Sequence, residues 1–224
     1  MTLPQTIELE PGAPARATVF ILHGLGADGT DFLPFADELK LADVGPVRFV
    51  FPRAPVRPVT ANGGAAMRAW YDIFTFGSSG GPMREDEDGL RESFAAVHGL
   101  LEREMARGIA ARRIVLAGFS QGGAITLQTG LRQAEPLAGL IALSSYLPLA
   151  PLFEAERSAG SAKVTVFLAH GSADPVVPLA RGVASRDQLK SLGYAVEWHD
   201  YPMPHSVCTE EIEHIAGFMK RVLA

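Results

Sequence analysis

A serine at the junction between a strand pattern and a helix pattern constrains this chain most. Residues 113–118 form an apolar run of strand length, and from Ala124 onward the apolar residues recur at helical spacing. Between them lies Gly118-Phe119-Ser120-Gln121-Gly122, a G-x-S-x-G pattern. This pattern is typical of a sharp strand-to-helix turn that exposes a serine hydroxyl, and its small residues let the backbone bend. The sequence therefore predicts a nucleophilic Ser120 at the end of a strand.

A helix that begins directly after Ser120 would also stabilise negative charge beside the hydroxyl. The first N–H groups of a helix have no intrahelical partner and carry a partial positive charge. The backbone N–H of Gln121 is the first such donor. An ordinary glycine-rich turn would show the same residues, so the catalytic hypothesis needs partners for the serine elsewhere in the chain.

Length and composition predict one globular domain over residues 1–224. The chain has 224 residues, 47% of them hydrophobic, and a chain of this size buries roughly 70% of its unfolded surface. Cys208 is the only cysteine, which excludes an internal disulfide. The net charge of −5, with dispersed basic residues, argues against a nucleic-acid partner. No apolar run approaches the ~20 residues that cross a bilayer, and no signal peptide is recognised, so we expect a cytoplasmic protein without integral membrane association.

Strand patterns and helix patterns alternate along the chain, which predicts an α/β fold with a mostly parallel central sheet flanked by helices. Ligand sites of such sheets lie at the carboxyl ends of the strands. The predicted strands are residues 7–10, 17–22, 47–51, 113–118, 137–143, 164–168 and 195–198. One helix is predicted to begin after the N-cap Asp31, and four more are predicted at residues 88–108, 124–131, 179–192 and 210–223. Loops are predicted at residues 52–64, 77–82 and 144–162.

A catalytic serine needs a base and an acid that orients the base. With a serine on this kind of turn, the acid and then the histidine follow it along the chain. His199 falls at a strand end and His214 inside the last helix, whereas His205 lies in a proline-bounded loop between strand and helix. We therefore predict that His205 is the base.

For the acid, Asp174 is favoured over two later aspartates. Asp187 falls in a helix and Asp200 at a strand end, but Asp174 follows a strand at the sheet edge where Ser120 and His205 are expected. An Asp-Pro turn is the alternative interpretation of Asp174.

The loop that begins His23-Gly24-Leu25-Gly26 would supply the second oxyanion donor, the backbone N–H of Leu25. His23 could instead bind a metal together with His170 and Asp174, but the usual closely clustered ligand pattern of metal hydrolases is not found. We therefore predict neither a metal nor a cofactor. Cys208 lacks a glycine-rich turn or a helix start that would activate its thiol, so it is not predicted to be a nucleophile.

Seven segments, in order and across nearly the whole chain, resemble the α/β-hydrolase carboxylesterases related to acyl-protein thioesterases and lysophospholipases. These segments are His23-Gly24-Leu25-Gly26-Ala27-Asp28-Gly29 with Asp31-Phe32, Phe51-Pro52-Arg53-Ala54-Pro55, Trp70-Tyr71-Asp72-Ile73, Gly118-Phe119-Ser120-Gln121-Gly122-Gly123-Ala124, Leu143-Ser144-Ser145-Tyr146-Leu147-Pro148, His170-Gly171-Ser172-Ala173-Asp174-Pro175-Val176-Val177-Pro178 and Tyr201-Pro202-Met203-Pro204-His205.

The resemblance implies an α/β-hydrolase fold without a large cap domain and a triad of Ser120, Asp174 and His205. It implies an oxyanion hole formed by Leu25 and Gln121, in agreement with the positions of these residues in the predicted loops.

The same resemblance implies that Trp70 and Leu147 lie near the acyl group of the substrate, and Tyr146 is predicted to bind substrate beside Leu147. Without the resemblance, a position in the core is the safer interpretation of Trp70. Tyr146 stands where eukaryotic thioesterase members often have tryptophan, so the chain looks more like the bacterial esterases. The segment 146–162 is too short for a separate helical cap, which predicts an open site walled by residues 52–64, 75–86 and 146–147.

The favoured hypothesis is a serine esterase that cleaves short- to medium-chain carboxylic esters or thioesters of small molecules through an acyl-enzyme. The competing hypotheses are a non-catalytic ligand-binding protein on a hydrolase scaffold, and a lysophospholipase or acyl-protein thioesterase. A homodimer is compatible with each of them.

Overall fold

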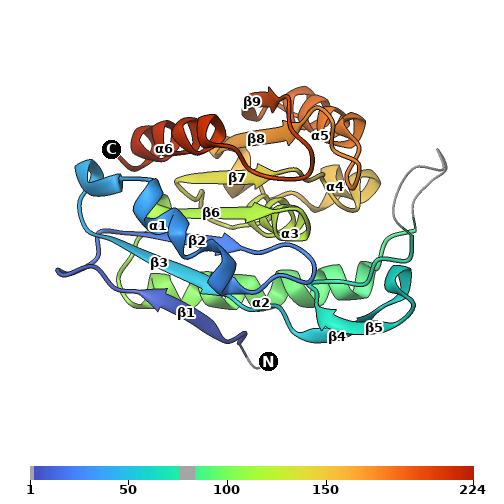
Figure 1. Cartoon of the computed structure of the whole chain (residues 1–224). Coiled ribbons are helices and arrows are strands. Elements are labelled where there is room, and N and C mark those ends of the chain that lie inside the picture. Colours follow the sequence, from blue (N-terminus) through green and yellow to red (C-terminus); the bar gives the residue numbers. More distant parts are fainter. Residues whose placement is uncertain (1–2, 76–83) are drawn as a thin grey trace.

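A twisted sheet runs through the centre of the protein (Figure 1). The structure is a computed structural model that describes residues 3–75 and 84–224. Within these residues, seven strands pair in the order β1-β3-β2-β6-β7-β8-β9; β1 is antiparallel to β3, and all other neighbours are parallel. The strands are β1 (Thr6–Leu9), β2 (Ala17–Leu22), β3 (Val47–Pro52), β6 (Ile114–Phe119), β7 (Gly139–Leu143), β8 (Thr165–Gly171) and β9 (Ala195–Tyr201).

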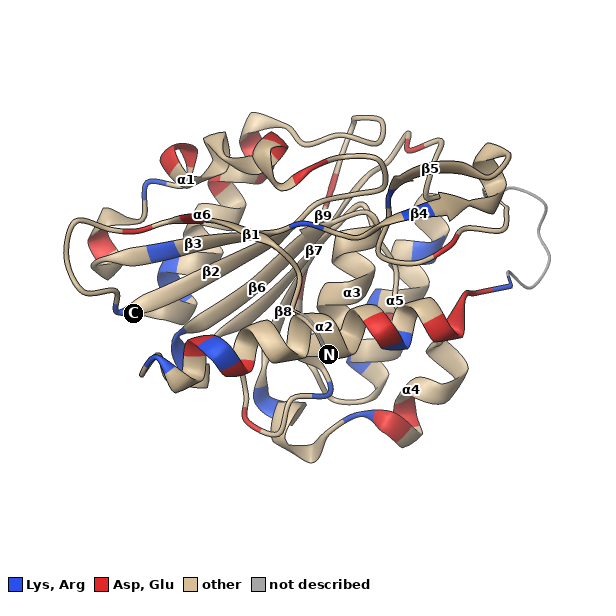
Figure 2. Cartoon of the chain, turned by 90° about the horizontal axis from the view of Figure 1, so that it is seen from below, with Lys and Arg blue, Asp and Glu red and all other residues tan. Residues whose placement is uncertain are grey.

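Helices cover both faces of this sheet (Figure 1), which confirms the predicted architecture. One face carries α1 (Pro34–Glu38) and α6 (Thr209–Leu223); the other carries α2 (Glu87–Ala106), α3 (Gln121–Gly130), α4 (Ala150–Glu156) and α5 (Leu179–Ser191). Figure 2 shows the charged residues mainly on the outer helices and loops, while β6 and β7 carry none. No helix in the described ranges is both long and apolar enough to cross a membrane.

Strand alternation divides the core into two layers. In β2, Phe20 and Leu22 pack on the side of α2 and α3, whereas Val19 and Ile21 pack on the side of α6. All of these side chains are almost completely buried. Successive residues of a strand point to opposite faces, so a strand covered on both faces is a continuous apolar run, as it is here.

Three predicted segments differ from the structure. Asp28, not Asp31, is the N-cap of the first turn: its carboxylate accepts from the Thr30 N–H, and it begins the 3-10 turn Gly29–Phe32 ahead of α1. The predicted loop 144–162 contains α4, whose Phe153 is fully buried. The stretch 77–82, predicted as a loop, lies outside the described residues.

The third difference is a hairpin where a loop, 52–64, was predicted. Strands β4 (Val56–Val59) and β5 (Ala65–Arg68) pair antiparallel beside the main sheet. The hairpin is held to the following segment because the carboxylate of Asp72 accepts from both the N–H and the hydroxyl of Thr60. Pro58 and the exposed Val56 weakened the strand pattern in the sequence.

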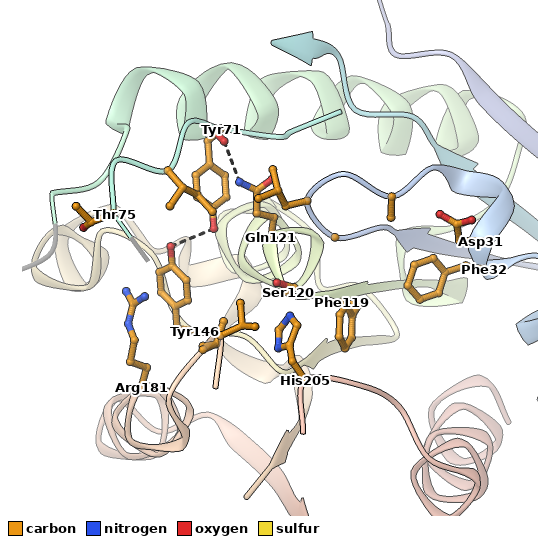
Figure 3. A pocket seen from close by; sticks show the side chains of 16 residues that line it. Asp31, Phe32, Tyr71, Thr75, Phe119, Ser120, Gln121, Tyr146, Arg181 and His205 are labelled. Carbon is orange, nitrogen blue, oxygen red and sulfur yellow. Dashed lines mark hydrogen bonds between the residues drawn. The ribbon is translucent and has the colours of Figure 1, made fainter. Parts of the chain in front are cut away.

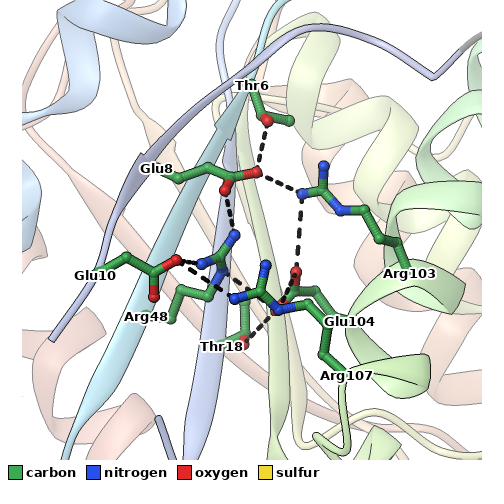
Figure 4. A network of polar contacts seen from close by, with 8 residues as sticks. All are labelled: Thr6, Glu8, Glu10, Thr18, Arg48, Arg103, Glu104 and Arg107. Atoms are coloured by element: carbon green, nitrogen blue, oxygen red, sulfur yellow. Dashed lines mark hydrogen bonds and ion pairs between the residues drawn. The ribbon is translucent and has the colours of Figure 1, made fainter. Parts of the chain in front are cut away.

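A buried ion-pair network attaches the edge strand to the rest of the molecule (Figure 4). The Arg48 side chain on β3 is 1% exposed and contacts Glu8 and Glu10 from the β1 segment. Its Nε also lies 3.3 Å from a carboxylate oxygen of the fully buried Glu104 on α2. Glu104 in turn accepts a 3.1 Å hydrogen bond from the Thr18 hydroxyl. Burying such charges is tolerated because each has partners of opposite charge.

Candidate active site

Ser120 occupies a strained backbone position at the end of β6. Its φ of 55° and ψ of −118° are rare for a residue with a side chain. Hydrogen bonds hold this conformation: the Ser120 N–H donates to the Leu143 carbonyl at 2.8 Å, and the Ser145 hydroxyl donates to the Ser120 carbonyl at 2.7 Å. The turn thus presents the hydroxyl at the carboxyl edge of the sheet.

The glycines on each side of Ser120 allow α3 to approach the sheet closely. A Cβ on Gly118 would lie 2.3 Å from the Gly122 carbonyl group. A Cβ on Gly122 would lie 2.2 Å from the Leu22 carbonyl oxygen. Neither position has room for a side chain, which is the physical reason for the G-x-S-x-G spacing.

Asp174 and His205 are in direct contact, although they are far apart in the chain. The Nδ1–H of His205 donates a 2.6 Å hydrogen bond to the Asp174 carboxylate, whose side chain is fully buried. The other carboxylate oxygen accepts the N–H groups of Val176 and Val177 at 2.8 and 2.9 Å. The carboxylate is therefore fixed by the backbone of its own loop and can orient the imidazole.

The imidazole of His205 lies between Asp174 and the serine. Figure 3 shows its ring directed toward the Ser120 hydroxyl, and both residues line one pocket. The Phe119 ring packs against the imidazole with 4.7 Å between centroids. A base held on one side by a carboxylate and directed on the other toward a hydroxyl has the arrangement that serine activation requires.

Two backbone N–H groups meet at the same place from different loops. Among the described residues, the N–H groups of Leu25 and Gln121 have no hydrogen-bond acceptor. Gln121 is the first residue of α3. Leu25 follows β2, and Leu25, Ser120 and Gln121 all line the pocket. Free donors beside a nucleophile are suited to stabilise an oxyanion.

His23 shapes the Leu25 loop and is not exposed to a ligand. Its buried ring accepts from the Ala54 N–H at Nε2, 3.0 Å away, so Nδ1 carries the proton and donates to the Gly24 carbonyl at 2.8 Å. Burial lowers the pKa of His23, which keeps the ring neutral. The ring is thus a rigid brace for the backbone that carries the Leu25 N–H.

The side chain of Gln121 has a role that the sequence did not reveal. Its Oε1 accepts from the Trp70 N–H at 3.1 Å, and its Nε2 donates to the Tyr71 carbonyl at 2.8 Å. The Trp70 indole in turn donates to the His23 carbonyl at 2.9 Å. These bonds join the two oxyanion loops through the segment that contains Trp70. No local pattern in the chain signals this connection.

The three residues expected near the acyl group lie at different depths. Tyr146 lines the pocket, which has a volume of about 380 Å³. Trp70 is fully buried and Leu147 is 3% exposed, and neither is among the described residues that line this pocket. Trp70 borders a separate cavity beside the hairpin, and Leu147 borders another beside α5.

The residues that line the pocket also differ in part from the predicted walls. The segment 52–64 borders the cavity beside Trp70 and not the pocket of Ser120. Thr75 and Tyr146, from the predicted walls 75–86 and 146–147, do line it, and residues 76–83 lie outside the described residues. Tyr71, Ile73, Val176 and Val177 are further lining residues. Helix α4, in the connection after β7, does not border the pocket.

The alternative partners of Ser120 have other contacts. His199 and His214 stack on each other at 4.5 Å, and Asp187 pairs with Arg186. The exposed Asp200 accepts from the half-buried Trp198 indole at 3.2 Å. None of the four borders the pocket of Ser120.

The metal and thiol alternatives find no support in the described residues. The described residues contain no group of three or more His, Cys, Asp or Glu side chains that could hold a metal ion. His170 donates from Nε2 to the Val177 carbonyl at 2.8 Å, and burial lowers its pKa. Cys208 does stand at a helix start, contrary to expectation, because it is the N-cap of α6; it does not line the pocket of Ser120.

Comparison with known proteins agrees with this geometry. The family model described as Phospholipase/Carboxylesterase matches residues 5–223. Acyl-protein thioesterase 1 of Neurospora crassa is 43% identical over 209 residues, covering 91% of this chain and 85% of the relative. Acyl-protein thioesterase 1 of Mycosarcoma maydis is 40% identical over 239 residues, covering 100% of this chain and 99% of the relative.

A solved structure supports the same assignment. The crystal structure of SOBER1 from Arabidopsis thaliana superposes with a TM-score of 0.87 at 31% identity, covering 94% of this chain and 100% of that one. The α/β-hydrolase fold predicted from the sequence is therefore confirmed. With a family match over nearly its whole length, this chain belongs to the phospholipase/carboxylesterase family.

Proposed function

We propose that this protein is a serine hydrolase that cleaves carboxylic esters and thioesters of short to medium acyl chains through an acyl-enzyme. The observation that carries the proposal is the 2.6 Å contact between Asp174 and His205, with the imidazole directed toward Ser120 on its strained turn (Figure 3). The relatives named acyl-protein thioesterase 1 add support for thioesters as substrates.

In the proposed mechanism, the Ser120 Oγ attacks the carbonyl carbon of the substrate while His205 Nε2 accepts the hydroxyl proton. The carbonyl oxygen becomes an oxyanion and accepts hydrogen bonds from the Leu25 and Gln121 N–H groups. When the tetrahedral intermediate collapses, His205 gives the proton to the leaving alcohol or thiol. Water then attacks the acyl-enzyme by the same steps, which releases the acid and restores Ser120. The mechanism needs no metal or cofactor.

A fluorophosphonate probe tests this proposal against a non-catalytic ligand-binding protein. We expect stoichiometric labelling of Ser120 in the native chain and in Cys208→Ala, and no labelling of Ser120→Ala. Folded native protein that remains unlabelled would refute the proposed function.

The acyl preference is measured with a series of alkyl esters and thioesters of increasing chain length. We expect kcat/KM for uncharged acyl groups to rise from acetyl to about four to eight carbons and then to level off, since each buried CH₂ contributes only about 0.8 kcal/mol where there is wall to receive it. A steep preference for palmitoyl esters would contradict this. The cytoplasmic location and the homodimer remain predictions.

A further inference from the structure

We propose that this enzyme prefers short acyl groups with a carboxylate at the far end, and that Arg181 binds this carboxylate. The inference rests on the proposed function, because it assigns one end of the same pocket. Esters and thioesters of short dicarboxylic acids, such as succinic or glutaric acid, are the substrate class.

The direction of the substrate follows from the position of His205. This residue must give a proton to the leaving group, so the leaving group has to lie on its side of Ser120. The Phe119 ring packs against His205, and the Phe32 ring lies 6.3 Å from Phe119 between centroids. Figure 3 shows Phe32 at one end of the pocket and Arg181 at the other, with Ser120 between them. The acyl group therefore extends toward Arg181.

The acyl end of the pocket begins apolar and ends polar. Ile73, Val176 and Val177 line it without offering polar side-chain atoms. Farther from Ser120, the hydroxyls of Tyr71 and Tyr146 face each other at 3.0 Å (Figure 3). A long hydrocarbon chain would reach these polar groups and form no hydrogen bonds with them, which limits its favourable length.

The tyrosine pair offers a hydrogen-bond donor. Two hydroxyls carry two hydrogens, and the bond between Tyr71 and Tyr146 uses one of them. Burial raises the pKa of both phenols, so both keep their protons at neutral pH. A carboxylate accepts hydrogen bonds but donates none, which suits it to an end that presents N–H and O–H groups.

Arg181 supplies positive charge at this end. Its guanidinium carbon lies 3.5 Å from the centroid of the Tyr146 ring, an arrangement that orients the cation beside the tyrosine pair. The residue is half-buried and lines the pocket. It also stands in the first turn of α5, where the helix dipole disfavours a cation. The contact with Tyr146 holds the guanidinium at this end of the pocket, where its charge is suited to a carboxylate.

Among the described residues, Glu85 and Asp31 are the acidic groups near the two ends of the pocket. Glu85 borders a second cavity together with Tyr146 and Arg181. Burial raises the pKa of Glu85, and the Leu149 N–H and the charge of Arg181 offset this in part. Asp31 borders the pocket at the opposite end, on the side of the leaving group. The pocket is thus basic where the acyl group ends and acidic where the leaving group departs.

The test compares matched pairs of ethyl esters, with acid release followed by titration. Monoethyl glutarate is paired with ethyl pentanoate, and monoethyl succinate with ethyl butanoate, so that only a carboxylate replaces a methyl group. One of the two charged esters should be the better substrate of the native enzyme. For that ester we expect kcat/KM to be about 10-fold higher than for its matched uncharged ester, the gain that one charge-assisted contact provides. The ratio should fall as salt is added.

Substitutions separate the role of Arg181 from general effects. Arg181→Met should lower the ratio to below one, and Arg181→Lys should restore part of it. Glu85→Gln should raise the ratio because it removes a competing negative charge. The matched control is Arg186→Met on the same helix, where the guanidinium lies over Trp198 away from the pocket; its ratio should equal that of the native enzyme.

Labelling of Ser120 by a neutral fluorophosphonate shows that each variant is folded and that its nucleophile works. A labelled native enzyme that hydrolyses both uncharged esters at least as well as their charged partners would overturn the role of Arg181 and leave the proposed function intact. An unchanged ratio in Arg181→Met would overturn it as well. Absence of labelling in the native chain would instead refute the proposed function.

Discussion

The indole N–H of Trp70 donates a 2.9 Å hydrogen bond to the backbone carbonyl of His23, immediately before the loop that carries Leu25. The backbone N–H of Trp70 donates at the same time to the Gln121 side chain. The ring is fully buried. Trp70 therefore contacts both loops that supply the oxyanion donors, and it acts on them from the core and not from the pocket.

Trp70→Phe should lower kcat with little change in KM. The substitution keeps an aromatic ring but removes the bond to the His23 carbonyl, and one hydrogen bond is worth about 1 kcal/mol, or roughly a 5-fold change. Steady-state kinetics on a short uncharged ester measure the effect, and the rate of fluorophosphonate labelling should fall in parallel. Trp198→Phe, whose indole bonds the exposed Asp200, is the control and should behave as the native enzyme. A large rise in KM alone would instead place Trp70 in contact with the substrate.

Ser120→Ala and His205→Ala should each reduce kcat by about 10⁴ or more, and the double variant should be hardly slower, because the two groups act as a unit. Asp174→Asn should also be severe, since the amide cannot hold the imidazole as the carboxylate does. Asp200→Asn is the control and should be mild. Additive losses in the double variant would show that Ser120 and His205 do not work together.

The buried Glu211 should make the stability of the fold depend on pH. It is fully buried in the first turn of α6, and burial raises its pKa from 4.5 to about 8, offset in part by the Cys208 N–H. Between these two values the folded chain binds a proton that the unfolded chain does not, so the free energy of unfolding should fall as pH rises through this window. The total effect is on the order of a few kcal/mol.

Urea unfolding at several pH values from about 5 to about 8 measures this dependence. At the upper end of this pH range, Glu211→Gln should gain stability relative to the native chain. Its free energy of unfolding should also change less with pH. Glu210→Gln, at the exposed neighbouring position, should keep the native slope. Identical slopes in all three proteins would mean that Glu211 ionises in the fold as it does in the unfolded chain.

Arg48→Met should destabilise the fold by about 1.5–3 kcal/mol, because it removes the nearest of three guanidinium groups that face the fully buried Glu104, while those of Arg103 and Arg107 remain at 3.7 and 3.9 Å. The double variant Arg48→Met/Glu104→Leu should lose much less than the two single variants together, since it buries no unpaired charge between them. Lys220→Met is the control: it breaks an exposed pair with Asp43 and should cost about 0–1 kcal/mol. Thermal or urea unfolding gives the comparison.

Most of the sheet and the central turn could be predicted from the chain alone, because they depend on local rules. Apolar runs such as 17–22 and 137–143 have the length and composition of buried strands, and the structure has β2 and β7 there. The glycines around Ser120 could be read in the same way, since the close approach of α3 to the sheet excludes any side chain at Gly118 and Gly122.

Other features depend on contacts between residues that are distant in the chain, and no local pattern reports these. Trp70 bonds a carbonyl 47 positions earlier and an amide side chain 51 positions later, so its place in the core follows from how the hairpin segment packs on α3. The hairpin β4–β5 and helix α4 looked like loops because prolines interrupt their short patterns. The cation at the acyl end of the pocket likewise appears only when α5 is packed beside Tyr146. Packing of whole elements sets these distances, and it depends on the summed burial of many side chains, which short-range sequence patterns do not encode.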